Sequence, residues 1–169
     1  MKVLITVLDW GLGHATRCIP VIRELLFRGC IVSVAGNGDS LRLLKNEFPA
    51  LAYFELAGYN PVYPSRGGMA IRMAFQLPKF VKVIREEHRV VKSLVQTENF
   101  DLIISDNRYG CWSQHVPSIF ITHQLNIQLP EKLRWLSKAV NRLQSKLINK
   151  FSTCWIPDFP DTETNLSGE

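Results

Sequence analysis

The chain has 169 residues, a net charge of +5 at pH 7 and a hydrophobic content of 46%. It is long enough for one domain with its own core, and its apolar runs are far shorter than the roughly 20 residues of a membrane-spanning helix. The N-terminus carries one lysine and no small-residue cleavage site, so we expect no signal peptide and a cytoplasmic protein. Four scattered cysteines without a C-x-x-C pair argue against a disulfide framework or a cysteine metal site.

Six short segments have the pattern of buried strands. The first, 2–8, is a continuous run of β-branched residues and leucine, which is typical of a strand buried on both faces. The others are expected at 31–35, 51–56, 101–105, 118–122 and 152–156.

Helical patterns separate these strands. The first helix is expected over 15–28 and ends at Gly29, as at a C-terminal cap. The second begins where Asp39 or Ser40 can serve as the cap and runs through Phe48. Two longer helices are expected over 69–95, with a kink or break at Pro78, and over 131–149. The alternation predicts an α/β fold: a Rossmann-like, doubly wound, mainly parallel sheet flanked by helices.

Ligands of such sheets bind beyond the carboxyl ends of the strands, where the segments 9–16, 106–110 and 123–128 should meet. The first is a glycine-rich turn before a helix, which suits close approach of an anion. A dinucleotide fingerprint would need glycine at Thr16 and an acid after the second strand, where Gly36 and Asn37 stand. The sequence also lacks Gly-Lys-Ser/Thr and Asp-x-Asp. We therefore expect neither a bound cofactor nor a metal.

His14 is the candidate general base. It stands at a helix start, where the neutral imidazole is favoured and can accept a proton from a hydroxyl. Asp106 comes at the end of a buried strand and should reach the same crevice. There it can accept the second ring N–H of His14 and stabilise the imidazolium. Each residue also has a structural explanation, since the His14 ring can fill the turn and Asp106 can cap the next helix.

The residues Gly11-Leu12-Gly13-His14, with the helix after them, resemble the N-terminal signature of inverting GT-B glycosyltransferases. These are the MurG-type enzymes of family 28 and the glucosyl- and glucuronosyltransferases of family 1. The resemblance to family 1 implies that His14 is the general base and that Asp106 orients it. The segments 105–110 and 120–125 are similar to those of a bacterial group of uncharacterised MurG-like proteins. One departure is Pro20, six residues after the histidine, where these families usually have proline at the third.

The resemblance implies the acceptor-side half of an inverting, metal-independent glycosyltransferase. Residues 1–157 would be the domain, and 158–169 the start of an interdomain linker. The nucleotide-sugar, expected to be UDP-linked, would bind a C-terminal half beyond this chain, so the chain alone should be inactive. The expected acceptor is a lipid-linked or cell-surface glycan. The alternatives are half of a nucleotide-sugar 2-epimerase, which shares the fold, and a non-catalytic nucleotide- or glycan-binding module.

Residues expected to contact the acceptor come from the three segments at the carboxyl edge. They are Gly11, Gly13, Thr16, Asn107, Arg108, Tyr109, His123, Gln124 and Asn126. For the last three, a helix-capping or loop role is an equal alternative.

Two segments concentrate the positive charge. Residues 131–150 carry six cations against one glutamate, and residues 66–92 carry seven against two. Such helices either pack on the core and expose their basic face to solvent, or they dock on anionic lipid at the inner face of a membrane. The residues expected to face a membrane are Lys79, Lys82, Arg134, Lys138, Arg142 and Lys146. The expected apolar face of helix 131–149 is Leu133, Leu136, Val140, Leu143 and Leu147. No nucleic-acid-binding module is recognisable, so we expect no nucleic-acid partner.

Overall fold

The computed structural model describes residues 1–60, 76–127, 129 and 131–157. In these residues one six-stranded sheet has the order β3-β2-β1-β4-β5-β6, and all neighbouring strands are parallel. The strands are β1 (Lys2–Val7), β2 (Ile31–Gly36), β3 (Ala52–Glu55), β4 (Leu102–Asp106), β5 (Ser118–Ile121) and β6 (Thr153–Trp155). The predicted Rossmann-like, doubly wound fold is confirmed.

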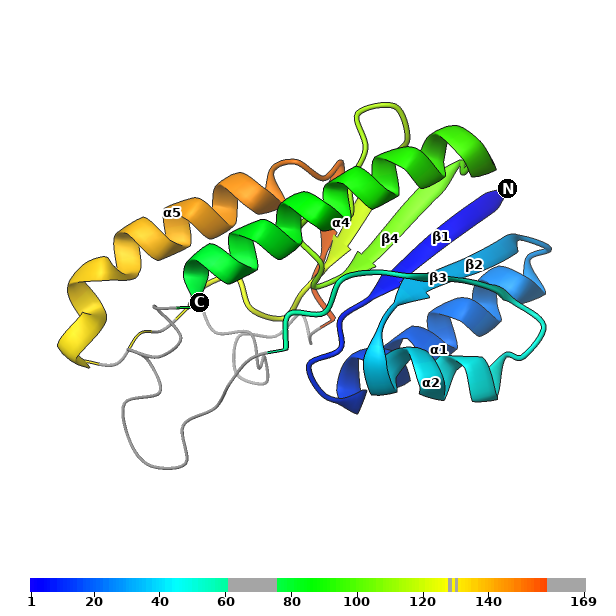
Figure 1. Ribbon diagram of the computed structural model, residues 1–169, viewed down its shortest axis with the longest axis horizontal. Coiled ribbons are helices and arrows are strands. Elements are labelled where there is room, and N and C mark those ends of the chain that lie inside the picture. The colour runs from blue at the N-terminus through cyan, green and yellow to red at the C-terminus, as the bar shows by residue number, and fades with distance from the viewer. Residues whose placement is uncertain (61–75, 128, 130, 158–169) are drawn as a thin grey trace.

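Helices cover both faces of the sheet (Figure 1). Helices α1 (Leu12–Phe27) and α2 (Gly38–Glu47) lie on one face, and α4 (Leu77–Glu98) and α5 (Ser137–Ile148) on the other. Successive residues of β1 feed the two cores, because side chains of a strand alternate between faces. Ile5 packs into the core that contains residues of α1 and α2, and Leu4 into the core that contains Val91 of α4. This double burial explains the continuous apolar run of β1.

Two helices begin at residues other than those predicted. Helix α1 starts at Leu12, so His14 lies within its first turn. Helix α2 starts at Gly38, and neither Asp39 nor Ser40 is its cap residue. Instead, Asp9 from the end of β1 accepts a hydrogen bond of 3.1 Å from the backbone N–H of Ser40. A carboxylate from another element thus takes the role expected of a local cap.

The two later helices also differ from the prediction. Pro78 lies in the first turn of α4, which begins at Leu77, a position where its missing N–H removes no hydrogen bond within the helix. The part of the predicted helix before residue 76 lies outside the described residues. The predicted helix 131–149 is divided into a 3-10 segment, η1 (Glu131–Leu136), and α5.

The predicted apolar face of the last helix is only partly correct. Leu143 is 50% exposed, whereas Gln144 is the buried residue of α5. The amide Nε2 of Gln144 donates to the carbonyl oxygen of Gln124 at 2.6 Å and lies 3.3 Å from the hydroxyl of Tyr109. Polar contacts therefore hold α5 against the loops after β4 and β5. The side chain of Leu133 lies outside the description.

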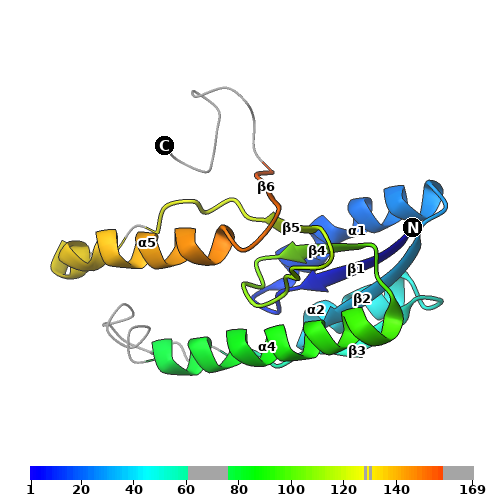
Figure 2. The same ribbon diagram turned by 90° about the horizontal axis from the view of Figure 1, so that it is seen from above.

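The strand order changes direction between β1 and β4, because β2 and β3 lie beyond β1 on one side and β5 and β6 lie beyond β4 on the other. The carboxyl ends of these two strands form the switch point at which such sheets bind ligands. The first parts of α4 and of η1–α5 extend past this edge (Figure 2). The sheet thus places α1, the end of β4 and the loop after β5 around one position.

Candidate active site

The two predicted catalytic residues meet at the switch point. Asp106 is the last residue of β4, pairs with Val7 of β1 and is fully buried. His14 reaches it from the first turn of α1, with 2.8 Å between His14 Nδ1 and Asp106 Oδ1. The side chain of His14 is 15% exposed. This geometry lets the buried carboxylate fix the orientation of a ring that still reaches the surface.

Arg17 is a third member of this cluster and was missed from the sequence. Its Nε donates to Asp106 Oδ2 at 2.9 Å, and its Nη2 donates to Oδ1 at 2.5 Å. Partial burial opposes the charge of Arg17, but the hydrogen bond and charge of Asp106 raise its pKa above the usual value. Helical spacing carried the signal, because a residue three positions after His14 lies on the same helix face. Arg17 also holds the position where the resembling families usually have proline.

Cys18 lies beneath the cluster, with its Sγ 3.7 Å from Asp106 Oδ2. Burial and the neighbouring carboxylate raise the pKa of this thiol well above its usual value. The thiol therefore stays protonated and acts as a small buried group. All four cysteines are free, with Cys18 and Cys111 buried.

The turn before α1 is open at its two glycines. Gly11 has a φ of 96°, and among the described residues no heavy atom lies within 4 Å of where a Cβ would stand at Gly11 or at Gly13. Thr16 is exposed, and its hydroxyl donates to the carbonyl oxygen of Gly13 at 3.1 Å. A ligand can therefore approach the backbone of this turn closely.

The loop after β5 contributes one side chain near the cluster. His123 is exposed, and its Nδ1 lies 3.4 Å from Nη1 of Arg17. Gln124 and Asn126 are exposed as well, but they contact α5: the carbonyl of Gln124 accepts from Gln144, and Oδ1 of Asn126 accepts from Asn141. Of the predicted residues in this loop, His123 is therefore the one the structure brings to the His14–Asp106 pair.

Arg108 lies inside the protein, contrary to the expectation that it contacts an acceptor. It is fully buried and pairs with the buried carboxylate of Glu87 on α4 at 2.8 Å. Its other N–H groups donate to the carbonyl oxygens of Val7 and Ala57, at 2.6 and 3.0 Å, and to Oδ1 of Asn37. Its donors bind the protein itself, so this side chain is structural.

The backbone turn after Asp106 directs Arg108 inward. Asn107 has a left-handed φ of 54°, a conformation that asparagine tolerates better than most residues. Tyr109 is partly buried and packs its ring on Phe120, with 4.9 Å between ring centroids. Burial raises the pKa of Tyr109. Tyr109 thus contacts Phe120 of β5 and Gln144 of α5 rather than His14 or Asp106.

Glu87 completes the buried network around Arg108 and was not among the residues predicted for the site. Its Oε2 accepts from the hydroxyl of Tyr59 at 2.9 Å and from the N–H of Gly110 at 3.0 Å. Burial raises the pKa of Glu87, although Arg108 and the hydrogen bonds oppose this shift. The network joins α4 to the strand ends that carry the site.

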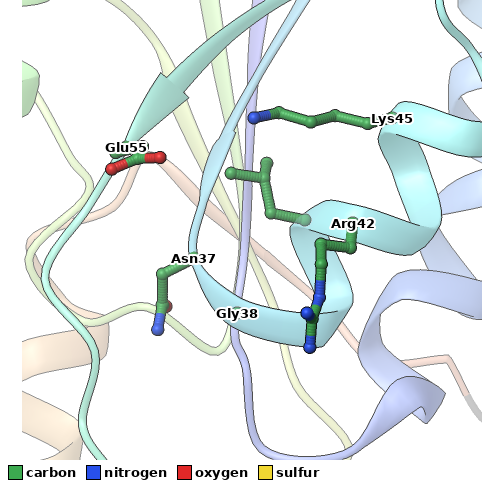
Figure 3. Close-up of a pocket in the computed structure, with 6 residues that line it drawn as sticks. Asn37, Gly38, Arg42, Lys45 and Glu55 are labelled. Atoms are coloured by element: carbon green, nitrogen blue, oxygen red, sulfur yellow. The ribbon is translucent and has the colours of Figure 1, made fainter.

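A separate pocket lies at the β2–β3 side of the sheet (Figure 3). It has a volume of about 290 Å³ and is lined by Asn37, Gly38, Leu41, Arg42, Lys45 and Glu55. Arg42 and Lys45 extend from α2, and Glu55 ends β3. The lining includes neither His14 nor Asp106, so this pocket is distinct from the candidate active site.

The described residues contain no group of three or more His, Cys, Asp or Glu side chains placed to hold a metal ion. In the same residues, no helix is long and apolar enough to cross a membrane.

The fold is that of the N-terminal half of GT-B enzymes. The chain matches MurG from Acinetobacter baumannii with a TM-score of 0.50 and 17% identity, over 97% of this chain and 44% of that one. It matches the glycosyltransferase SnogD from Streptomyces nogalater with a TM-score of 0.54 and 15% identity, over 91% and 44%. It also matches a UDP-GlcNAc 2-epimerase from Neisseria meningitidis, with a TM-score of 0.56 and 16% identity, over 94% and 40%.

The curated relatives are glycosyltransferases by name. The chain is 26% identical to an uncharacterized glycosyltransferase of Methanosarcina acetivorans, over 95% of this chain and 43% of the relative. A second one, from Methanosarcina mazei, is 24% identical over 95% and 44%. The chain thus spans less than half the length of these relatives. No family model matches it.

Proposed function

We propose that this chain is the acceptor-binding half of an inverting, metal-independent glycosyltransferase in which His14 is the general base. The contact between His14 Nδ1 and Asp106 Oδ1 carries the proposal. When Nδ1 donates its hydrogen to the carboxylate, Nε2 keeps a lone pair, which is the form of imidazole that removes a proton from a hydroxyl. Asp106 then stabilises the imidazolium that forms.

The reaction proposed is a single displacement at the sugar. The acceptor oxygen bonds to the anomeric carbon while the bond from that carbon to the nucleotide diphosphate breaks. The acceptor proton passes to Nε2 of His14, and the diphosphate leaves with the electron pair of the broken bond. A second domain would hold the nucleotide-sugar, expected to be UDP-linked, and stabilise the leaving diphosphate. No cofactor takes part, and this chain alone would be inactive.

The turn at Gly11 and Gly13 before α1, together with His123, which lies beside Arg17 of the same helix, would receive the acceptor. We propose a lipid-linked or cell-surface glycan, because polar groups surround the cluster and two basic helices extend past the same edge. Gln124 and Asn126 would border this acceptor site, since hydrogen bonds to α5 set their position.

The fold does not separate a transferase from a 2-epimerase, because solved structures of both match the chain. Two observations favour a transferase. The curated relatives are named glycosyltransferases, and a histidine oriented by a buried aspartate suits proton removal from a hydroxyl. A module that only binds a nucleotide or glycan would have no need of such a base.

The test uses the two-domain protein, meaning this chain joined to its donor-binding half. We expect transfer of sugar from a nucleotide-sugar to a glycan acceptor, with inversion at the anomeric carbon, in the presence of EDTA. NMR of the product gives its anomeric configuration. Retention of configuration would contradict His14 as the base of a single displacement. Epimerisation of the nucleotide-sugar without an acceptor would identify the alternative enzyme.

We further propose that the protein is cytoplasmic and touches the inner face of a membrane through α4, η1 and α5. Large apolar side chains are exposed on these elements: Leu77 is 46% exposed, Trp135 77% and Leu143 50%. They stand among exposed cations, namely Lys79, Lys82, Arg134, Lys138, Arg142 and Lys146. Exposed apolar groups with cations around them suit an anionic lipid surface.

Co-sedimentation with vesicles that contain anionic lipid tests this contact. Changing Arg134, Lys138 and Arg142 together to glutamine should weaken binding strongly at low salt, because each cation contributes about 1 kcal/mol near such a surface. The matched control changes Arg23 in α1, Arg28 directly after α1 and Lys45 in α2 to glutamine, which removes the same charge from the opposite face of the sheet. Equal losses in the two variants, or binding that is indifferent to salt, would contradict the proposal.

A further inference from the structure

Arg17 and His14 compete for one carboxylate oxygen. Asp106 Oδ1 lies 2.8 Å from His14 Nδ1 and 2.5 Å from Arg17 Nη2. The same Nη2 lies only 3.1 Å from His14 Nδ1. Arg17 always donates, whereas a neutral histidine carries its hydrogen on one ring nitrogen and accepts at the other. His14 Nδ1 can therefore donate to Asp106 or accept from Arg17, but it cannot do both.

The two arrangements differ in what His14 can do. If Nδ1 donates to Asp106, the lone pair is on Nε2 and the ring can act as a base. If Nδ1 accepts from Arg17, Nε2 carries the hydrogen and cannot take another proton in the neutral ring. In the first arrangement the Nδ1–H group is repelled by the guanidinium of Arg17. In the second, the lone pair of Nδ1 is repelled by the carboxylate of Asp106. Because each has one favourable and one unfavourable charged neighbour, neither is strongly preferred.

The charged and titratable groups at this cluster come from three elements. Helix α1 supplies Arg17 and the thiol of Cys18, β4 supplies Asp106, and the loop after β5 supplies His123. Asp106 is fully buried, and burial keeps the Cys18 thiol protonated. Among the described residues at this cluster, Arg17 is thus the cation that opposes the base-competent arrangement.

Arg17 can also reach an incoming ligand. Its side chain is 23% exposed, and Nη1 faces the exposed ring of His123 at 3.4 Å. Gly11 and Gly13 stand at the start of the same helix, and among the described residues no heavy atom lies within 4 Å of a Cβ placed at either of them. A guanidinium pairs with phosphate oxygens through two parallel hydrogen bonds, so a phosphate here would compete with Asp106 for it.

We propose that Arg17 is a positioning residue that controls the tautomer of His14. While its guanidinium binds Asp106, the inactive tautomer with hydrogen on Nε2 is populated. When a phosphate group of a substrate draws the guanidinium away from Asp106, the base-competent tautomer with hydrogen on Nδ1 is favoured. This inference rests on the proposed function, in which His14 is the base. The phosphate belongs either to a lipid-linked acceptor or to the diphosphate of the donor. With either source, substrate binding would favour the tautomer of His14 that can act as the base.

The first experiment reads the tautomer of His14 directly in the 169-residue chain. Long-range ¹H–¹⁵N NMR at a pH where the ring is neutral distinguishes Nδ1–H from Nε2–H, and His14→Gln identifies the signals. We expect averaged shifts for both tautomers in the wild type and the Nδ1–H form in Arg17→Met. Inorganic pyrophosphate should move the wild-type signals toward those of Arg17→Met and leave that variant unchanged.

Arg23→Met is the matched control, because Arg23 lies on the same helix and pairs with Glu47 away from the cluster. It should behave as the wild type. Identical His14 shifts in the wild type and Arg17→Met would overturn the proposal, as would a pyrophosphate response that survives in Arg17→Met. The titration of the wild type decides the matter even if Arg17→Met fails to fold. Since the measurement needs no sugar transfer, its outcome is independent of the proposed enzymatic activity.

The source of the phosphate is distinguished in the two-domain protein. Arg17→Met should raise KM several-fold for the substrate that carries the phosphate, and it should change kcat much less, because the base is already in its competent tautomer. A higher KM for the acceptor alone identifies an acceptor phosphate, and a higher KM for the nucleotide-sugar identifies the diphosphate. If Arg17→Met instead lowers kcat several-fold and leaves both KM values unchanged, Arg17 does not have the proposed role of switching the tautomer.

Discussion

In the two-domain protein, His14→Gln lowers the rate of sugar transfer by roughly 100-fold or more, the usual contribution of a general base. The variant keeps a polar side chain of similar size at the start of α1, so the fold should be retained. Binding of the nucleotide-sugar should hardly change, because that substrate is held by the other domain. Steady-state kinetics and donor titrations measure the two effects separately.

Asp106→Asn and His123→Gln complete this series. An asparagine at the buried end of β4 has no negative charge to stabilise the imidazolium, and its amide nitrogen can donate to Nδ1 and favour the wrong tautomer of His14, so it should reduce kcat by a comparable factor. His123 lies beside Arg17 but, among the described residues, forms no hydrogen bond with Asp106, so its replacement should cost only a few-fold. Near-normal turnover in His14→Gln would remove the proposed base, and a larger loss in His123→Gln would move that role to the loop after β5.

Arg108→Met destabilises the chain by about 3–5 kcal/mol, the cost of leaving one partner of a buried ion pair alone. The variant leaves the carboxylate of Glu87 without its cation in a site where neither side chain has exposed surface. It also leaves the carbonyl oxygens of Val7 and Ala57 without these donors. Urea unfolding of the 169-residue chain, followed by circular dichroism, measures the change.

Two further variants show whether the buried charge is the cause. Arg23→Met removes an arginine whose side chain is 65% exposed, and it should change the unfolding free energy by less than about 1 kcal/mol. Combining Arg108→Met with Glu87→Gln should recover part of the loss, because the unpaired charge is then removed. A loss below about 1 kcal/mol in Arg108→Met would show that the ion pair is not essential to the fold.

The sheet could be predicted from the sequence because buried parallel strands leave a strong local pattern. The runs at 2–8 and 101–105 are mainly apolar and are followed by Asp9 and Asp106. Once both were placed in one parallel sheet, their carboxyl ends had to lie together, which brought His14 near Asp106. Helix boundaries were less predictable, because the cap of α2 comes from Asp9, some 30 residues earlier in the chain.

The burial of Arg108 could not be predicted, because it depends on a partner in another element. Glu87 stands among charged residues of a helix, where local pattern indicates a solvated face, and only the packing of α4 on the sheet shows it to be buried. The buried face of the last helix was predicted only in part for a similar reason. Contacts of Gln144 with two loops set its rotation, so Leu143 turns toward solvent. Arg17, in contrast, could have been selected from its spacing to His14.

The guanidinium of Arg108 binds groups that follow or end three different strands: Val7 at β1, Asn37 after β2 and Ala57 after β3. Arg108 itself follows β4, so its side chain ties the carboxyl ends of four neighbouring strands together from inside the protein, whereas His123 in the loop after β5 is exposed. Acceptor choice can then change through loop sequence, in evolution or by grafting, with little displacement of the reacting groups. The residues to leave untouched in such redesign are the buried ones, even though none of them meets the substrate.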